Sequence, residues 1–81
     1  MVYSISDLAI EAGVSYHTVY YYLREDLIRE SLLVGNRQRI FTESDLDRLK
    51  QIIALRKEGK SIEYIKGVLE KEAADVQAEH L

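Results

Sequence analysis

The chain has 81 residues, 47% of them hydrophobic, and a net charge of −3 from 11 basic and 14 acidic side chains. Its size allows one small domain with a single core, and the absence of cysteine excludes disulfides and thiolate metal sites. No apolar run is long enough to span a membrane and the start MVYSISDLA has no signal-peptide pattern, so we expect a globular cytoplasmic protein.

Two short helices joined by a tight turn are predicted at the start of the chain. Ser4 and Asp7 form a capping box in front of apolar residues at helical spacing, and Gly13 ends this first helix. Ser15 caps a second helix over residues 16–25. Two helices separated by so few residues are typical of a helix-turn-helix motif.

A change of pattern predicts a small β-hairpin after the second helix. Residues 28–34 and 37–41 have the composition of strands and flank a Gly-Asn turn of the hairpin type. Side chains two residues apart in a strand point the same way, so Arg37 and Arg39 would share one face of the second strand.

Two further helices complete the predicted domain. Thr42 and Asp45 form another capping box, and an apolar stripe runs from there to Gly59, a suitable helix end. Ser61 caps the fourth helix, whose predicted core face carries Ile62, Ile65, Val68 and Leu69.

The end of the chain is acidic. Residues 69–81 hold four acidic residues and one lysine, so the stretch 1–68 carries no net charge. We therefore expect a domain over 1–69 and an acidic helical tail over 70–81, which could be the start of a dimerisation helix.

The expected fold is mainly α with a small β-hairpin, in the order helix, helix, hairpin, helix, helix. A helix-turn-helix followed directly by a two-stranded wing is a winged helix-turn-helix, in which the second helix enters the major groove of DNA. The residues predicted to fill its core are Leu8, Ala9, Val14, Val19, Leu23, Leu27, Ile40, Leu46, Leu49, Ile53, Ile65 and Leu69.

Three stretches, taken in order, resemble the MerR family of bacterial transcription regulators. They are YSISDLAIEAGVSYHTVYYY, RIFTESDLDRL and LRKEGKSIEYIKGVL, and together they lie within residues 3–69. The resemblance implies sequence-specific binding of double-stranded DNA, with the recognition helix 16–24 in the major groove and the hairpin wing 28–41 on the backbone.

Three departures accompany this resemblance. Tyr20 stands where the family usually has an arginine, which removes one charge attracted to phosphate, and Asp26 stands where the family usually has glycine. Asp tolerates left-handed backbone better than most residues, so the fold need not suffer. Family members also continue into a long dimerisation helix and an effector domain, so the 81 residues are either a minimal relative or a fragment.

The predicted DNA contacts lie on the second helix, the wing and the start of the fourth helix. Tyr16 and Tyr20 share the outward face of the helix, whereas the ring of Tyr22 should be largely inside with its hydroxyl at the edge. The resemblance matches Arg39 to the family's wing arginine and Lys60 to a second wing. The full set of candidates is Tyr16, His17, Thr18, Tyr20, Tyr21, Tyr22, Arg24, Arg37, Arg39 and Lys60.

Structural readings of the same residues stay open. The tyrosines could pack only on the wing or on a partner protomer, and the wing arginines could serve to keep an edge strand solvated. Arg24 could pair with Glu25 or Asp26 rather than with phosphate.

Catalysis is not expected, and neither is a cofactor. The two histidines have no nucleophile or carboxylate partner at a recognisable spacing, and neither a metal-ligand cluster nor a glycine-rich phosphate loop is present. Two alternatives to transcription control remain. One is a module that binds proteins, favoured by the uncharged body and an apolar strip of Tyr16, Tyr20 and Leu32-Leu33; the other is an excisionase-like architectural protein that also binds DNA.

Dimerisation of the 81 residues is expected to be weak or absent. Beyond Leu69 only Ala73, Val76 and His80 follow a heptad stripe, and a coiled coil needs several heptads. The resemblance implies that a full-length protein of this family forms a homodimer on two half-sites.

Overall fold

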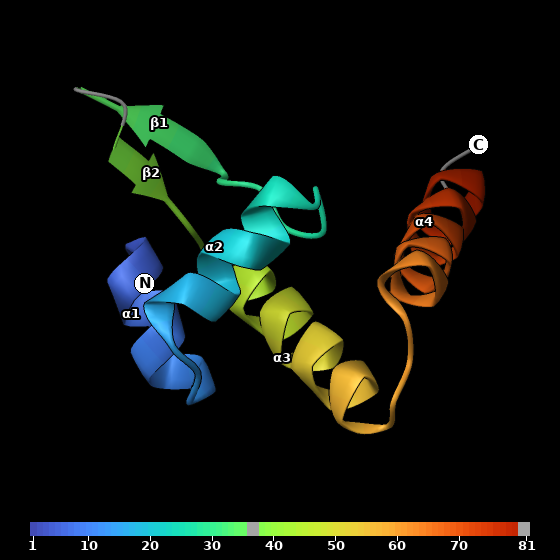
Figure 1. Cartoon of the computed structure of the whole chain (residues 1–81). Coiled ribbons are helices and arrows are strands. Elements are labelled where there is room, and N and C mark those ends of the chain that lie inside the picture. The colour runs from blue at the N-terminus through green and yellow to red at the C-terminus, as the bar shows by residue number, and fades with distance from the viewer. Residues whose placement is uncertain (36–37, 80–81) are drawn as a thin grey trace.

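The computed structural model describes the backbone of residues 1–35 and 38–79, and the side chains of residues 1–31, 35 and 38–72. Four helices and one two-stranded antiparallel sheet make up this part of the chain (Figure 1). They follow in the order α1 Ile5–Ala12, α2 Tyr16–Arg24, β1 Leu32–Val34, β2 Gln38–Ile40, α3 Glu43–Lys57 and α4 Ile62–Glu79. The predicted order of elements is confirmed.

The turn between α1 and α2 forms as its residue types require. The hydroxyl of Ser4 accepts from the backbone N–H of Asp7, and the Asp7 carboxylate accepts from the N–H of Ser4, both at 3.1 Å. Gly13 has a φ of 71°, in the left-handed region that glycine adopts without steric cost. The Ser15 hydroxyl then accepts from the N–H of Thr18 at 3.1 Å and starts α2.

The hairpin is shorter than the sequence predicted. β1 comprises only Leu32–Val34 of the expected 28–34, and it pairs with Gln38–Ile40. Leu27 and Ile28 are buried, and Arg48 of α3 donates from Nε to the Leu27 carbonyl at 2.7 Å. The segment before β1 is therefore held against the helices instead of pairing as a strand. The predicted Gly-Asn turn is only partly described, because residues 36–37 lie outside the described part.

The chain start adds a bridge to the end of the hairpin. Tyr3 and Phe41 exchange two backbone hydrogen bonds of 2.8 Å in an antiparallel bridge. Phe41 has no exposed surface, whereas its neighbour Ile40 is half-buried. The prediction that Ile40 belongs to the core is wrong by one position, because the bridge to Tyr3 turns Phe41 inward.

All of the other predicted core residues are buried or packed on the core. Val14, Leu23 and Ile53 are partly buried at its margin. The residues of the prediction that lie fully inside are Leu8, Ala9, Val19, Leu27, Leu46, Leu49, Ile65 and Leu69. The core also contains Tyr3, Tyr22, Ile28, Phe41 and Ile52, which the predicted list left out.

Helix α4 lies on the opposite side of α3 from α1 and the hairpin (Figure 1). Its Ile65 and Leu69 are buried in the core, and two polar contacts add to this packing: Gln51 donates to Glu72 at 2.9 Å, and Lys66 lies 3.7 Å from Glu25. The helix continues from Leu69 into the predicted tail without a break. Within the described residues, no helix is both long enough and apolar enough to cross a membrane.

Candidate nucleic-acid interface

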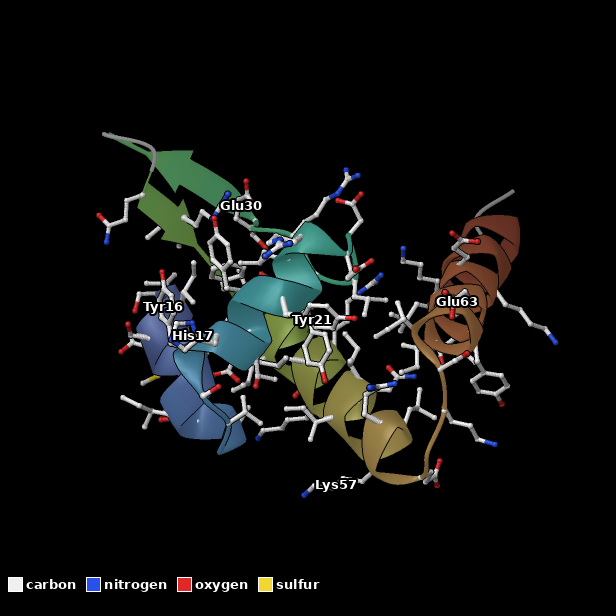
Figure 2. All side chains as sticks on the ribbon, in the orientation of Figure 1. Tyr16, His17, Tyr21, Glu30, Lys57 and Glu63 are labelled. Atoms are coloured by element: carbon white, nitrogen blue, oxygen red, sulfur yellow. The ribbon has the colours of Figure 1, made fainter. Side chains whose placement is uncertain are left out.

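The outward face of α2 is aromatic and exposed. Tyr16 and Tyr20 stack with ring centroids 6.2 Å apart and an interplanar angle of 15°, and His17 packs edge-on against Tyr16 at 6.1 Å. Tyr16 is 46% exposed and Tyr20 is 40% exposed. Tyr16 and His17 stand at the start of the helix, with Tyr21 further along (Figure 2). The prediction that Tyr16 and Tyr20 share an outward face is confirmed.

The opposite face of α2 holds the helix on the core. Val19 has no exposed surface, and Leu23 packs on the core one turn later. Tyr22 is 6% exposed, so its ring is inside the core as expected. A contact between its hydroxyl and DNA stays a prediction. This division into a buried and an exposed face is what frees the aromatic side chains for a ligand.

Two other candidates on α2 have neighbours within the chain. The Thr18 hydroxyl lies 3.0 Å from the Ser15 hydroxyl in the helix cap, which uses part of its hydrogen-bonding capacity. The ring centroid of Tyr21 lies 5.6 Å from that of Tyr22, and Tyr21 remains 41% exposed. Contacts by either residue to DNA stay predictions.

The hairpin places Arg39 beside the carboxylate of Glu30. Arg39 lies opposite Leu33 in the sheet, and its Nε is 3.7 Å from Oε2 of Glu30. Both side chains are partly exposed, at 39% and 26%. The predicted common face of Arg37 and Arg39 lies outside the described residues, because Arg37 does.

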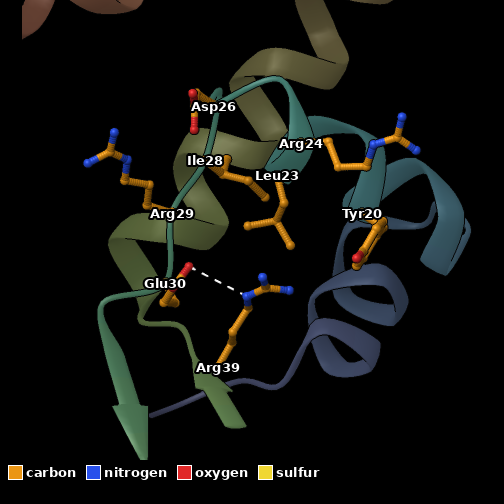
Figure 3. A pocket seen from close by; sticks show the side chains of 8 residues that line it. All are labelled: Tyr20, Leu23, Arg24, Asp26, Ile28, Arg29, Glu30 and Arg39. Atoms are coloured by element: carbon orange, nitrogen blue, oxygen red, sulfur yellow. Dashed lines mark ion pairs between the residues drawn. The ribbon is translucent and has the colours of Figure 1, made fainter. Parts of the chain in front are cut away.

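A hollow of about 380 Å³ separates α2 from the hairpin and from the segment that leads into it (Figure 3). Charged side chains dominate its wall. It is lined by Tyr20, Leu23, Arg24, Asp26, Ile28, Arg29, Glu30 and Arg39. Helix α2 and the wing thus share one recess with charged residues of both signs, and its Arg39 guanidinium lies beside Glu30 whereas those of Arg24 and Arg29 point away from Arg39 (Figure 3).

Arg29 and Glu30 are the residues of this recess that the sequence reasoning missed. Both were assigned to a strand from residue 28 onward, where their side chains would have pointed to alternate faces of the hairpin. In the structure they belong to the irregular segment before β1. The left-handed Asp26, with a φ of 59°, turns the chain into that segment.

Arg24 and Lys60 lie at the margins of this arrangement. Arg24 is exposed on the hollow's rim, and its guanidinium points away from Arg39 (Figure 3). Its predicted alternative partner Glu25 pairs with Lys66 instead. The Nζ of Lys60 lies 4.9 Å from the ring centroid of Tyr64, at the end of α3 remote from the hairpin. Contacts of Arg24 and Lys60 with phosphate stay predictions.

The base of the hairpin is bonded to the start of α3. The Asp45 carboxylate accepts from the Ser31 hydroxyl at 2.6 Å and from the Thr42 backbone N–H at 2.8 Å. One carboxylate therefore caps the helix and holds the strand that enters the hairpin. This fixes the direction in which the wing leaves the core.

A second polar contact braces the same corner. The hydroxyl of Tyr3 donates to Oε1 of Glu43 at 2.6 Å. That hydrogen bond to Glu43, followed by burial and the charges of nearby carboxylates, raises the pKa of Tyr3 from 10.0 to about 12. The phenol is therefore neutral at physiological pH and serves as a donor.

Other kinds of site find little support in the described part of the chain. It contains no group of three or more His, Cys, Asp or Glu side chains that could hold a metal ion. His17 sits among aromatic neighbours on the exposed face of α2.

The sequence profile described as MerR HTH family regulatory protein matches residues 3–72. Among characterised relatives, the transcriptional activator mta of Bacillus subtilis is 31% identical over 78 residues, covering 96% of this chain and 30% of that protein. The transcriptional regulator ZntR of Escherichia coli is 37% identical over 68 residues, covering 84% and 48%. The chain thus spans less than half the length of these curated relatives.

Solved structures resemble the whole arrangement. HiNmlR, described as a MerR family regulator lacking the sensor domain and bound to promoter DNA, superposes with a TM-score of 0.84 at 28% identity. The match covers 91% of this chain and 56% of that one. The N-terminal part of the Bacillus subtilis multidrug transporter activator gives a TM-score of 0.78 at 30% identity, covering 95% and 78%.

Proposed function

This chain belongs to the MerR family of helix-turn-helix regulatory proteins, and from that premise we propose that it binds double-stranded DNA as the recognition domain of a cytoplasmic transcription regulator. In this proposal α2 enters the major groove and the hairpin grips the adjoining backbone. The observation that carries it is the exposed aromatic face of α2 beside a recess lined by three arginines.

The two parts of the interface would contribute in different ways. Tyr16 and His17 stand at the start of α2, the part of a recognition helix that meets base edges. Arg39 on β2 would meet phosphate, which positions the protein without reading sequence. Tyr20 lines the recess together with Arg39, and there its hydroxyl can donate to phosphate.

The test is a binding titration of four proteins against a specific and a random duplex at two salt concentrations. Arg39→Ala should weaken binding to both duplexes similarly and lower the salt slope by about one phosphate's worth. His17→Ala should cost roughly 1–3 kcal/mol on the preferred site and little on random DNA, because a base contact discriminates between sequences.

Tyr20→Arg restores the residue usual in the family and completes the set. It should raise affinity for both duplexes by adding a charge beside phosphate, with the larger gain at low salt. If the parent does not bind at low salt and Tyr20→Arg is also silent, DNA binding is wrong and a protein-binding module is the better reading. The excisionase-like alternative predicts the same contacts with DNA.

A further inference from the structure

The recess between α2 and the hairpin is less positive than its arginines alone would make it. Arg24, Arg29 and Arg39 line it, but so do Asp26 and Glu30. Glu30 is the carboxylate that faces Arg39, and a dashed line joins the two in Figure 3. The guanidinium that the proposed function places on phosphate therefore already has an anionic neighbour.

The geometry of the Glu30–Arg39 pair indicates that Glu30 offsets the charge of the guanidinium and does not fix its orientation. The 3.7 Å between Nε and Oε2 is longer than a hydrogen bond, so Glu30 does not hold the guanidinium in one orientation. Both side chains are partly exposed, and an ion pair of this kind contributes little to stability. The carboxylate nonetheless lowers the positive potential at the place where a phosphate would sit.

We infer that Glu30 attenuates DNA binding by competing with phosphate for Arg39, an inference that rests on the proposed function. A phosphate that reaches Arg39 has to displace the carboxylate or accept its repulsion. Glu30 thus sets the strength of the wing contact, most of all for random DNA, where backbone contacts supply nearly all of the affinity. Tyr20 also lines the recess, and because it is uncharged it does not alter the balance between positive and negative charge there. An arginine at this position would make the recess more positive.

The experiment compares Glu30→Gln with Glu25→Gln in the same titration. Glu25 is a matched control because it pairs with Lys66 at the same 3.7 Å, is partly exposed, and does not line the recess. Both variants remove one negative charge from one exposed ion pair. Glu30→Gln should raise affinity for a random duplex at low salt by about two- to fivefold over the control, the range that an exposed ion pair can supply.

Two further measurements show whether the gain acts through Arg39. In an Arg39→Ala background, Glu30→Gln should gain no more than Glu25→Gln does. In the protein without DNA, the nitrogen-15 resonance of Arg39 Nε should shift on Glu30→Gln and stay in place on Glu25→Gln.

Each contrary outcome has its own meaning. An Arg39 resonance unmoved by Glu30→Gln, or equal affinities of the two variants for DNA that the parent does bind, overturns the attenuation alone. An equal gain with and without Arg39 also overturns it, since the effect would then be a general one of charge. Failure of the parent and of Tyr20→Arg to bind any duplex overturns the proposed function, and the attenuation with it.

Discussion

Tyr3 ties the start of the chain to the end of the hairpin and to the start of α3 by three hydrogen bonds. Two join its backbone to Phe41, and the third runs from its hydroxyl to Glu43. Asp26 is a second residue with a large local effect, because its positive φ turns the chain after α2. Together with Asp45, these two residues set the path of the chain between α2 and the wing.

The contribution of the Tyr3 hydroxyl should depend on pH. Its pKa in the folded protein, about 12, lies above the ordinary 10.0, so the fold favours the protonated phenol. The resulting stability is fully present below about pH 10 and is lost as pH rises through about 12. Tyr3→Phe should therefore be less stable than the parent at pH 7, and the difference should shrink from pH 10 upward.

Urea unfolding at several pH values between 7 and 11.5 measures this difference. Tyr64→Phe, in which an exposed tyrosine loses its hydroxyl, corrects for general effects of high pH. A gap between parent and Tyr3→Phe that stays constant through pH 11.5 would show that the bond to Glu43 does not hold the proton.

At the scale of elements, each helix packs a stripe of apolar side chains into one shared core. Val19 from α2 and Leu49 from α3 have no exposed surface, and α4 contributes Ile65 and Leu69. The hairpin itself adds little to the core that the structure describes, and it is held by Asp45 at its base. Packing on the core therefore holds α2, and among the described residues Asp45 bonds the base of the hairpin to the start of α3.

Truncation of this core should be costly. Val19→Ala or Leu49→Ala should lower the free energy of unfolding by on the order of 1–4 kcal/mol, because each leaves a cavity at a site with no exposed surface. A domain of this size has only about 5–15 kcal/mol to lose. Ile10→Ala is the control, since Ile10 is 75% exposed, and chemical unfolding of either core variant at the parent's midpoint would contradict the assigned inward face.

At the scale of the whole molecule, charge is distributed unevenly along the chain. The body is neutral overall, three of its six arginines line the recess beside α2, and the excess of acidic residues lies in the last part of the sequence. DNA binding by such a molecule would depend on local contacts more than on net charge, which makes it sensitive to salt.

We expect residues 1–81 to be monomeric or weakly dimeric in solution. Beyond Leu69 only Ala73, Val76 and His80 follow a heptad stripe, about one and a half heptads, which is too short for a stable coiled coil. Sedimentation at micromolar concentration should give a monomer mass. A tight dimer under these conditions would show that surfaces other than this stripe associate.

The sequence alone was enough to predict the elements and the outward face of α2. Helix caps such as Ser4 and Ser15 and the left-handed Gly13 act through contacts within four residues along the chain, so a local pattern contains them. Helical spacing likewise separates Val19 from Tyr16 and Tyr20. The family resemblance drew on the same stretches.

Only the tertiary structure decided which distant residues meet. Two contacts join segments that are separate in the sequence: the bridge from Tyr3 to Phe41 and the ion pair of Glu30 with Arg39. The burial of Ile28 likewise depends on packing against other parts of the chain. No local sequence pattern encodes these contacts, because they form only when the helices pack together. The same packing keeps residues 28–31, between α2 and β1, from forming part of a regular strand. For this reason the hairpin came out shorter than predicted, and the carboxylate facing Arg39 was found only in the folded molecule.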